Sequence, residues 1–140
     1  MTAGLRNRRR PLRTPGRAAA GKRYADWLAS PEWHKRRRRW AKEEQRRRGC
    51  IVCALCGARW SQSHGDLHHL SYNRMGRESH DDLMAMCRPC HELVHRAIDA
   101  SRSWQKLISR GKRRQVTLAI IENIKQAQAR NAVSTGVTDE

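Results

Sequence analysis

The amino-acid sequence predicts an α+β fold in which a small ββα unit is stapled by a four-cysteine metal site and flanked by helices at both ends. Three observations predict it. Two Cys-x-x-Cys pairs, Cys53/Cys56 and Cys87/Cys90, enclose two short strand-like runs. A helix-like segment at residues 88–99 follows the second pair. The chain has no Phe and a mean hydropathy of -0.91, so its core is small and a metal staple is expected to add stability.

Length and charge restrict the class of protein. The 140 residues suffice for one modest domain with tails, and their net charge of +17 indicates a polyanionic partner, with nucleic acid the first candidate. A ribosomal or tail-driven basic protein would have a similar composition. No apolar run is long enough to span a membrane, and no apolar leader is visible. We therefore expect a cytoplasmic protein with its five cysteines reduced.

The N-terminal third is predicted to be a basic arm followed by a helical lead-in. Residues 1–22 are rich in Arg, Pro, Gly and Ala without apolar periodicity, which is typical of a disordered arm. Residues 23–49 form the lead-in. Within it, Tyr24, Trp27 and Leu28 lie on one face of a first short helix because their spacing is helical.

A second helix of the lead-in has clear start and stop signals. The Ser-Pro-Glu at residues 30–32 supplies a cap, a proline for the first turn and an acid near the positive helix end. Gly49 ends the helix, and Trp33 and Trp40, seven residues apart, are expected to face the core. The arginines between them are either solvated or bound to phosphates, and the nucleic-acid contacts predicted here are Arg36, Arg37 and Arg39.

Residues 50–100 are predicted to contain the ββα unit and both cysteine pairs. Residues 66–72 and 83–87 have the length and composition of short strands, joined by a glycine-containing loop. Residues 88–99 have the apolar spacing of a helix.

The C-terminal region is predicted to be helical. Within residues 101–132, one helix is expected over residues 104–108, ending before Gly111, and another over residues 114–130. The tail at residues 133–140 is expected to be frayed.

The two cysteine pairs predict a structural zinc site. Four thiolates suit a closed tetrahedral Zn²⁺ site, and paired Cys-x-x-Cys motifs in a reduced compartment favour metal over disulfides. Cys50 lies three residues before Cys53 and competes with it as a ligand. We expect Cys53 and Cys56 to form the pair, with Cys50 as a spare thiol, because Gly57 follows them and relieves the tight turn.

Five of the seven histidines fall within residues 68–95. His68 and His69 are neighbours on a predicted strand, so one can hold a metal while the other points to the opposite side. His91 and His95 are four apart on a predicted helix and share a face. Cys90 precedes His91 and points about 100° away from it, so one helix can serve two metal sites.

These motifs together resemble the HNH endonuclease family. Residues 66–95 read DLHHLSYNRMGRESHDDLMAMCRPCHELVH, which is similar to the ββα-metal (His-Me finger) motif of the subfamily with the pattern HHLxY…G…E…DL…LCxxCHxxxH. The upstream stretch YADWLASPEWHKRRRRWAKE, followed by CALCG, resembles the lead-in of small phage-encoded members. The resemblance covers residues 24–95 and excludes the arm and the C-terminal helices.

The resemblance implies a role for each motif residue. His69 would be the general base that activates water, and His68 and His91 would bind a catalytic divalent ion. His95 would be a third ligand. Asp82 stands where the family's middle Asn orients the base, so it is the second candidate catalytic residue. The cleaved DNA would carry 5′-phosphate and 3′-hydroxyl ends. The protein would act in the cytoplasm of a bacterium or a phage-infected host cell.

Several residues keep two interpretations. Asp82 either accepts a hydrogen bond that holds the histidine loop or caps a turn, which is a common role of Asp. His80 is expected to be a solvent-exposed loop residue. Three further arginines are either phosphate clamps or solvated surface residues: Arg74, Arg77 and Arg88.

The sequence thus predicts a DNA endonuclease with structural Zn²⁺ and a catalytic Mg²⁺, Mn²⁺ or similar ion. DNA is the expected partner, with phage packaging machinery as a possible protein partner. The main alternative is a non-catalytic zinc module that binds DNA, as a regulator or packaging accessory. A third is an RNA-binding basic protein, which explains the arm but neither histidine group.

Overall fold

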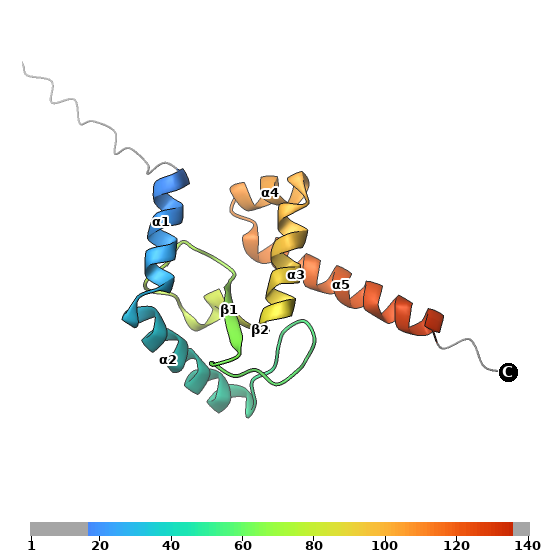
Figure 1. The fold of residues 1–140 in the computed structure, drawn as a ribbon, viewed down its shortest axis with the longest axis horizontal. Coiled ribbons are helices and arrows are strands. Elements are labelled where there is room, and N and C mark those ends of the chain that lie inside the picture. Colours follow the sequence, from blue (N-terminus) through green and yellow to red (C-terminus); the bar gives the residue numbers. More distant parts are fainter. Residues whose placement is uncertain (1–16, 136–140) are drawn as a thin grey trace, which may run out of the picture.

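The computed structural model describes residues 17–135, with side chains from 21 to 134, and has an α+β fold (Figure 1). It contains five α-helices, one short 3-10 turn and one two-stranded antiparallel sheet. In chain order the elements are α1 (Arg17–Leu28), α2 (Pro31–Arg48), β1 (Gly65–His69), η1 (His80–Asp82), β2 (Leu83–Cys87), α3 (Arg88–Asp99), α4 (Arg102–Ser109) and α5 (Arg113–Thr135). The predicted α+β class and the ββα order are confirmed.

Local chemistry determines the ends of α2 as predicted. The hydroxyl of Ser30 accepts the backbone N–H of Trp33, and the proline at residue 31 occupies the first turn. Gly49 adopts a φ of 77°, a left-handed conformation that costs glycine little, and its N–H closes the helix on the carbonyl of Gln45.

Some predicted boundaries need correction. Helix α1 begins at Arg17, so the part of the predicted arm from residue 17 to 22 is helical, whereas residues 1–16 lie outside the described residues. Three consecutive alanines in this stretch favour a helix. At the other end α5 continues to Thr135 instead of ending at residue 130, and residues 136–140 lie outside the described residues.

The two strands pair in a register that places alternate residues on opposite faces. Gly65 lies opposite Cys87, and His69 lies opposite Leu83. Strand β1 ends at His69, so the predicted strand over residues 66–72 is too long at its C-terminal end. The chain leaves the ladder there because the loop that follows begins to turn at Leu70.

Helices cover both faces of the hairpin. Helix α2 packs on one face through a tryptophan-rich core of Trp33, Trp40, Trp60, Leu67, Leu83 and Ala85. Helices α3 and α5 pack on the other face through a second core of Cys53, Leu55, Met86, Cys90, Val94, Ile98, Val116, Ile120 and Ile121. Neighbouring residues of β1 therefore contact different helices.

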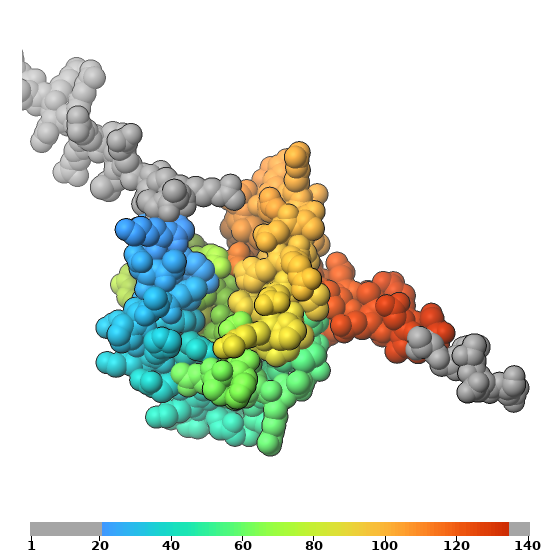
Figure 2. Space-filling view, viewed as in Figure 1, coloured from blue at the N-terminus to red at the C-terminus, as the bar shows by residue number. Residues whose placement is uncertain are grey.

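Helix α5 is only partly packed against the rest of the chain. Its first half contributes to the second core, whereas its second half projects from the body of the molecule (Figures 1 and 2). Side chains from residue 125 to 134 are exposed. Within the described part of the chain, no helix combines the length and apolar character that crossing a bilayer requires.

Candidate metal centre

Four cysteines lie together, two in the turn before Gly57 and two at the start of α3. The ligand atoms of Cys53, Cys56, Cys87 and Cys90 all lie within 4.8 Å of one another. Gly57 has a φ of 72°, and its N–H bonds the carbonyl of Cys53, which closes the turn that brings the first pair inward. The cluster could hold a metal ion.

Cys50 lies outside this group, as predicted from the position of Gly57, and it is exposed. The second pair is positioned by α3. Cys87 is the N-cap residue of the helix and Cys90 lies in its first turn, with the proline at residue 89 favouring the helix start.

The environment of the cluster divides the thiols into two kinds. Burial opposes ionisation of Cys53, but backbone hydrogen bonds outweigh it and lower the pKa of this thiol to about 7. Burial and the neighbouring thiols raise the pKa of Cys90 well above its ordinary value. Several thiolates therefore cannot share this space without a cation, and a divalent ion would supply the missing positive charge.

Three histidines form a second group on the α3 and α5 side of the hairpin. The ligand nitrogens of His68, His91 and His95 lie within 4.8 Å of one another. The Nε2 atoms of His91 and His95 are 3.0 Å apart, as their spacing on one helix face predicts. His68 projects toward them from β1, with its ring centroid 5.2 Å from that of His91.

The remaining nitrogens of this histidine group have polar partners. Nδ1 of His91 lies 3.1 Å from Oδ2 of Asp66, and Nε2 of His68 lies 3.0 Å from the hydroxyl of Thr117. Nδ1 of His68 is buried and has no hydrogen-bond partner among the described residues. A buried nitrogen without a partner carries a desolvation cost, and a metal ion would remove that cost.

Burial keeps two of these imidazoles, those of His68 and His95, in the form that binds metals. It lowers the pKa of His68 to about 2, with smaller contributions from Arg113 and the neighbouring histidines. Burial also lowers the pKa of His95, and His91 adds to the effect. Only neutral imidazole ligates a metal, so the group fits a divalent ion near neutral pH.

His69 points to the opposite face of the hairpin and is 1% exposed. Its ring stacks between Trp33, with centroids 5.0 Å apart, and Tyr72, at 5.2 Å. Tyr24 of α1 meets the same ring edge-on at 5.7 Å. Burial lowers the pKa of His69, while the nearby Glu78 carboxylate acts in the opposite direction.

Asp82 holds the loop that connects His69 to the 3-10 turn. Its carboxylate accepts hydrogen bonds from Nε and Nη2 of Arg74, at 2.8 and 2.7 Å, and from the N–H of Ser79 at 2.9 Å. The hydrogen bonds from Arg74 lower the pKa of Asp82 to about 2. Its backbone carbonyl accepts the N–H of Leu70, the residue after His69. Asp82 thus caps the turn and anchors the histidine loop, without a direct bond to the His69 ring among the described residues.

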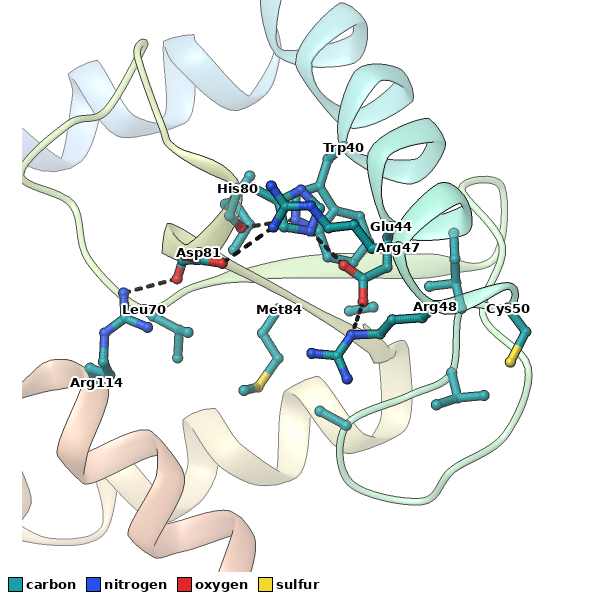
Figure 3. Close-up of a pocket in the computed structure, with 15 residues that line it drawn as sticks. Trp40, Glu44, Arg47, Arg48, Cys50, Leu70, His80, Asp81, Met84 and Arg114 are labelled. Carbon is teal, nitrogen blue, oxygen red and sulfur yellow. Dashed lines mark hydrogen bonds and ion pairs between the residues drawn. The ribbon is translucent and has the colours of Figure 1, made fainter.

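Two sequence predictions are wrong because of how α2 packs. His80 is not exposed: its side chain is 10% accessible and stacks on Trp40 with centroids 5.0 Å apart. Its two ring nitrogens meet carboxylate oxygens of Glu43 and Glu44 at 2.8 and 2.5 Å. Figure 3 shows His80 beside Trp40 at the wall of a pocket of about 480 Å³.

Arg36 is the second correction, because its side chain is only 7% exposed and cannot act as a surface contact to DNA. It donates from Nε to the backbone carbonyl of Glu78. Arg37 is half-buried and donates to the backbone carbonyls of Gln62 and Gly65. The other four predicted nucleic-acid contacts are exposed: Arg39, Arg74, Arg77 and Arg88.

Three further residues that contact the histidines were not predicted from the sequence: Glu78, Thr117 and Arg113. Glu78 lies in the loop that the resemblance covers, where an acid stands in the family pattern, so its position could have been noticed. Thr117 lies on the buried side of α5 with Val116 and Ile120, and the sequence carries no signal that its hydroxyl meets a histidine.

Comparison of the chain with protein-family models, with curated proteins and with solved structures finds no match. The chemistry of the site therefore rests on the residues that form it.

Proposed function

We propose that the chain is a metal-dependent DNA endonuclease of the HNH type, with a ββα-metal core. The observation that carries the proposal is the placement of His68 and His69. The first lies with His91 and His95 in a group fit for a metal, and the second projects from the same strand to the other face. A metal-binding histidine beside a histidine free to accept a proton is the arrangement that hydrolysis of a phosphodiester needs.

The histidine group is the proposed holder of the catalytic ion. His68, His91 and His95 offer three ring nitrogens, and imidazole ligands suit Zn²⁺ and Ni²⁺ better than Mg²⁺, which prefers oxygen. When bound, such an ion supplies a Lewis acid that stabilises negative charge on the phosphate and the leaving oxygen. The four-cysteine cluster is the proposed site of a structural Zn²⁺.

His69 is the proposed general base. Glu78 lies on the Nε2 side of the ring, which favours the tautomer with hydrogen on Nε2 and leaves Nδ1 to accept a proton from water. The ring is covered by Tyr72, which is itself 37% exposed, so access of water to His69 would require this side chain to move. Asp82 serves by holding the loop from Leu70 onward.

The exposed face of α2 is the proposed contact with DNA. Arg38, Lys42 and Arg46 follow one another at four-residue intervals and border an open groove, whereas Arg36 on the same helix faces inward. Helical residues four apart rise about 6 Å along the axis and share a face, so the three side chains form a basic row along α2. This row replaces Arg36 in the proposed interface.

One observation favours the second candidate, a non-catalytic zinc module that binds DNA. Both ring nitrogens of His69 are buried and lack a hydrogen-bond partner among the described residues, so the ring is enclosed as a packing residue would be. A regulator would need the cysteine cluster and the basic face but no accessible base.

Cleavage of supercoiled plasmid separates the two candidates. The experiment compares wild type, His69→Ala, His91→Ala and the exposed control His64→Ala over a titration of Zn²⁺, Ni²⁺, Mn²⁺ and Mg²⁺. Wild type and His64→Ala are expected to cut. His69→Ala loses about 10²–10⁴-fold at every metal concentration, because it lacks a proton acceptor. His91→Ala is expected to regain part of its activity at high metal concentration, because the substitution lowers the affinity for the catalytic ion.

Two outcomes would overturn the assignment. Cleavage by His69→Ala at the wild-type rate would show that His69 is not the general base. Wild type that binds DNA but never cuts it, with one zinc per chain and a folded circular dichroism spectrum, favours the regulator.

A further inference from the structure

Two residues of α5, one helical turn apart, contact the two neighbouring histidines of β1. Arg113 donates from Nε to the backbone carbonyl of His69 at 2.9 Å, and the hydroxyl of Thr117 lies 3.0 Å from Nε2 of His68. Helix α5 lies outside the part of the chain that resembles HNH endonucleases. The histidine pair is therefore held by a helix that the motif itself does not include.

The position of Thr117 is unusual for a packing residue. Its side chain is fully buried, and it lies on α5 between the core residue Val116 and the rest of the apolar face at Ile120 and Ile121. A valine there would fill nearly the same volume without a polar atom. A buried hydroxyl is costly unless it is hydrogen-bonded, and His68 is the partner it has.

The direction of this hydrogen bond determines which nitrogen of His68 is free. If Nε2 carries the hydrogen and donates it to the Thr117 hydroxyl, Nδ1 keeps its lone pair, and Nδ1 is the atom that is buried without a partner. Asp66 acts in the same way on the other side of the group: its carboxylate accepts from Nδ1 of His91 and leaves Nε2 of that ring facing His95.

We propose that Thr117 is a positioning residue of the histidine metal centre, which selects the His68 tautomer that presents Nδ1 to the ion. The inference rests on the proposed function only in its assumption that the histidine group binds a divalent ion. A hydroxyl can donate as well as accept, so the bond selects this tautomer when the Thr117 hydroxyl is the acceptor; with hydrogen on Nδ1, that nitrogen could not ligate an ion.

The test compares Thr117→Val, which removes the hydroxyl at nearly constant volume, with Thr117→Ser, which keeps it. Ser134→Ala, an exposed hydroxyl on the same helix, is the control. Zinc is retained in the cysteine cluster and Ni²⁺ is titrated calorimetrically into each protein. Thr117→Val is expected to bind Ni²⁺ about 10–100-fold more weakly, while Thr117→Ser and Ser134→Ala bind as wild type does.

A second measurement reads the tautomer directly. Nitrogen-15 spectra of the histidine side chains, recorded on wild type before Ni²⁺ is added, are expected to show hydrogen on Nε2 of His68. In Thr117→Val, the two tautomers are expected to be mixed. Hydrogen on Nδ1 in wild type overturns the proposal whether or not the valine variant folds.

The same experiment separates this inference from the proposed function. Equal Ni²⁺ affinity in Thr117→Val and wild type overturns the positioning role even if the protein cuts DNA. Weaker binding with a changed tautomer supports the positioning role even if no variant cuts DNA. If wild type binds no Ni²⁺, the histidine group is not a metal centre and the proposed role of Thr117 is wrong.

Discussion

Oε1 of Glu78 lies 3.6 Å from Nε2 of His69, and both side chains are fully buried. The second carboxylate oxygen of Glu78 has no hydrogen-bond partner among the described residues. A buried carboxylate that lies against an imidazole and otherwise accepts only the N–H of Gly76 has its charge directed at that ring.

Replacing Glu78 by Gln is therefore expected to lower DNA cleavage by about 10-fold or more, as a part of the ~10²–10⁴-fold that base catalysis contributes. The amide keeps the shape but removes the charge that orients the ring. The matched control is Glu92→Gln on the exposed side of α3. The measurement is the initial rate of plasmid nicking at saturating metal. Equal rates for both variants would show that Glu78 only fills space.

The cysteine cluster gives a prediction about folding. Cys56→Ser and Cys90→Ser are expected to yield unfolded or insoluble protein. The four thiols connect the turn at Cys53 and Cys56 to the start of α3, and the core is small. Cys50→Ser, an exposed cysteine outside the cluster, should be folded with one zinc. Zinc content and circular dichroism measure the outcome. A Cys90→Ser protein that is folded and free of zinc would contradict a structural role for the metal.

The row of basic residues on α2 predicts the salt dependence of DNA binding. Substitution of Arg38, Lys42 and Arg46 by Gln should reduce the slope of log affinity against log salt by about 3, since each phosphate contact contributes about 0.9. Substitution of Lys125 and Arg130, on the projecting half of α5, is the control and should change the slope little. Fluorescence anisotropy with a labelled duplex from low to moderate salt provides the slopes. An unchanged slope in the triple variant would show that the DNA-binding interface lies elsewhere on the protein.

The Arg74–Asp82 contact predicts how stability depends on pH. Because hydrogen bonds from Arg74 lower the pKa of Asp82 to about 2, this carboxylate stabilises the fold fully above about pH 4 and loses that contribution as the pH falls toward 2. Asp82→Asn should lose about 1.5–3 kcal/mol at neutral pH, as expected for a hydrogen bond to a charged group. The difference from wild type should shrink in acid.

Melting temperatures at pH 7, 5 and 3 check this dependence. Asp81→Asn is the control, because the Asp81 side chain is 83% exposed and its substitution should be nearly neutral throughout. A gap between wild type and Asp82→Asn that is constant over this range would mean that the carboxylate is not selectively stabilised in the folded state.

The parts of the fold that follow from local chemistry could be predicted from the sequence. Ser30 and Gly49 determine the ends of α2 through their own hydrogen bonds and backbone conformation. Strand alternation places His68 and His69 on opposite faces of the hairpin, and helical spacing places His91 and His95 on the same face of α3. Each of these depends on residues close together in the sequence.

The remaining features depend on contacts between distant segments. Arg36 and His80 lie 44 residues apart in the chain, and their burial arises from the packing of α2 against the loop before β2. Thr117 reaches His68 across 49 residues. A pattern of charge or polarity along the sequence does not reveal which distant residues meet, so Arg36 and His80 were expected at the surface and Thr117 was not singled out.

Cys90 and His91 are joined by one peptide bond, yet they face different metal-binding groups. If the four thiols bind zinc, the zinc fixes the first turn of α3 through Cys90. The position of that turn then determines where the imidazoles of His91 and His95 lie. For the proposed nuclease, a chelator that removes zinc would therefore disturb both groups: the cysteines directly, and the histidines through the start of α3.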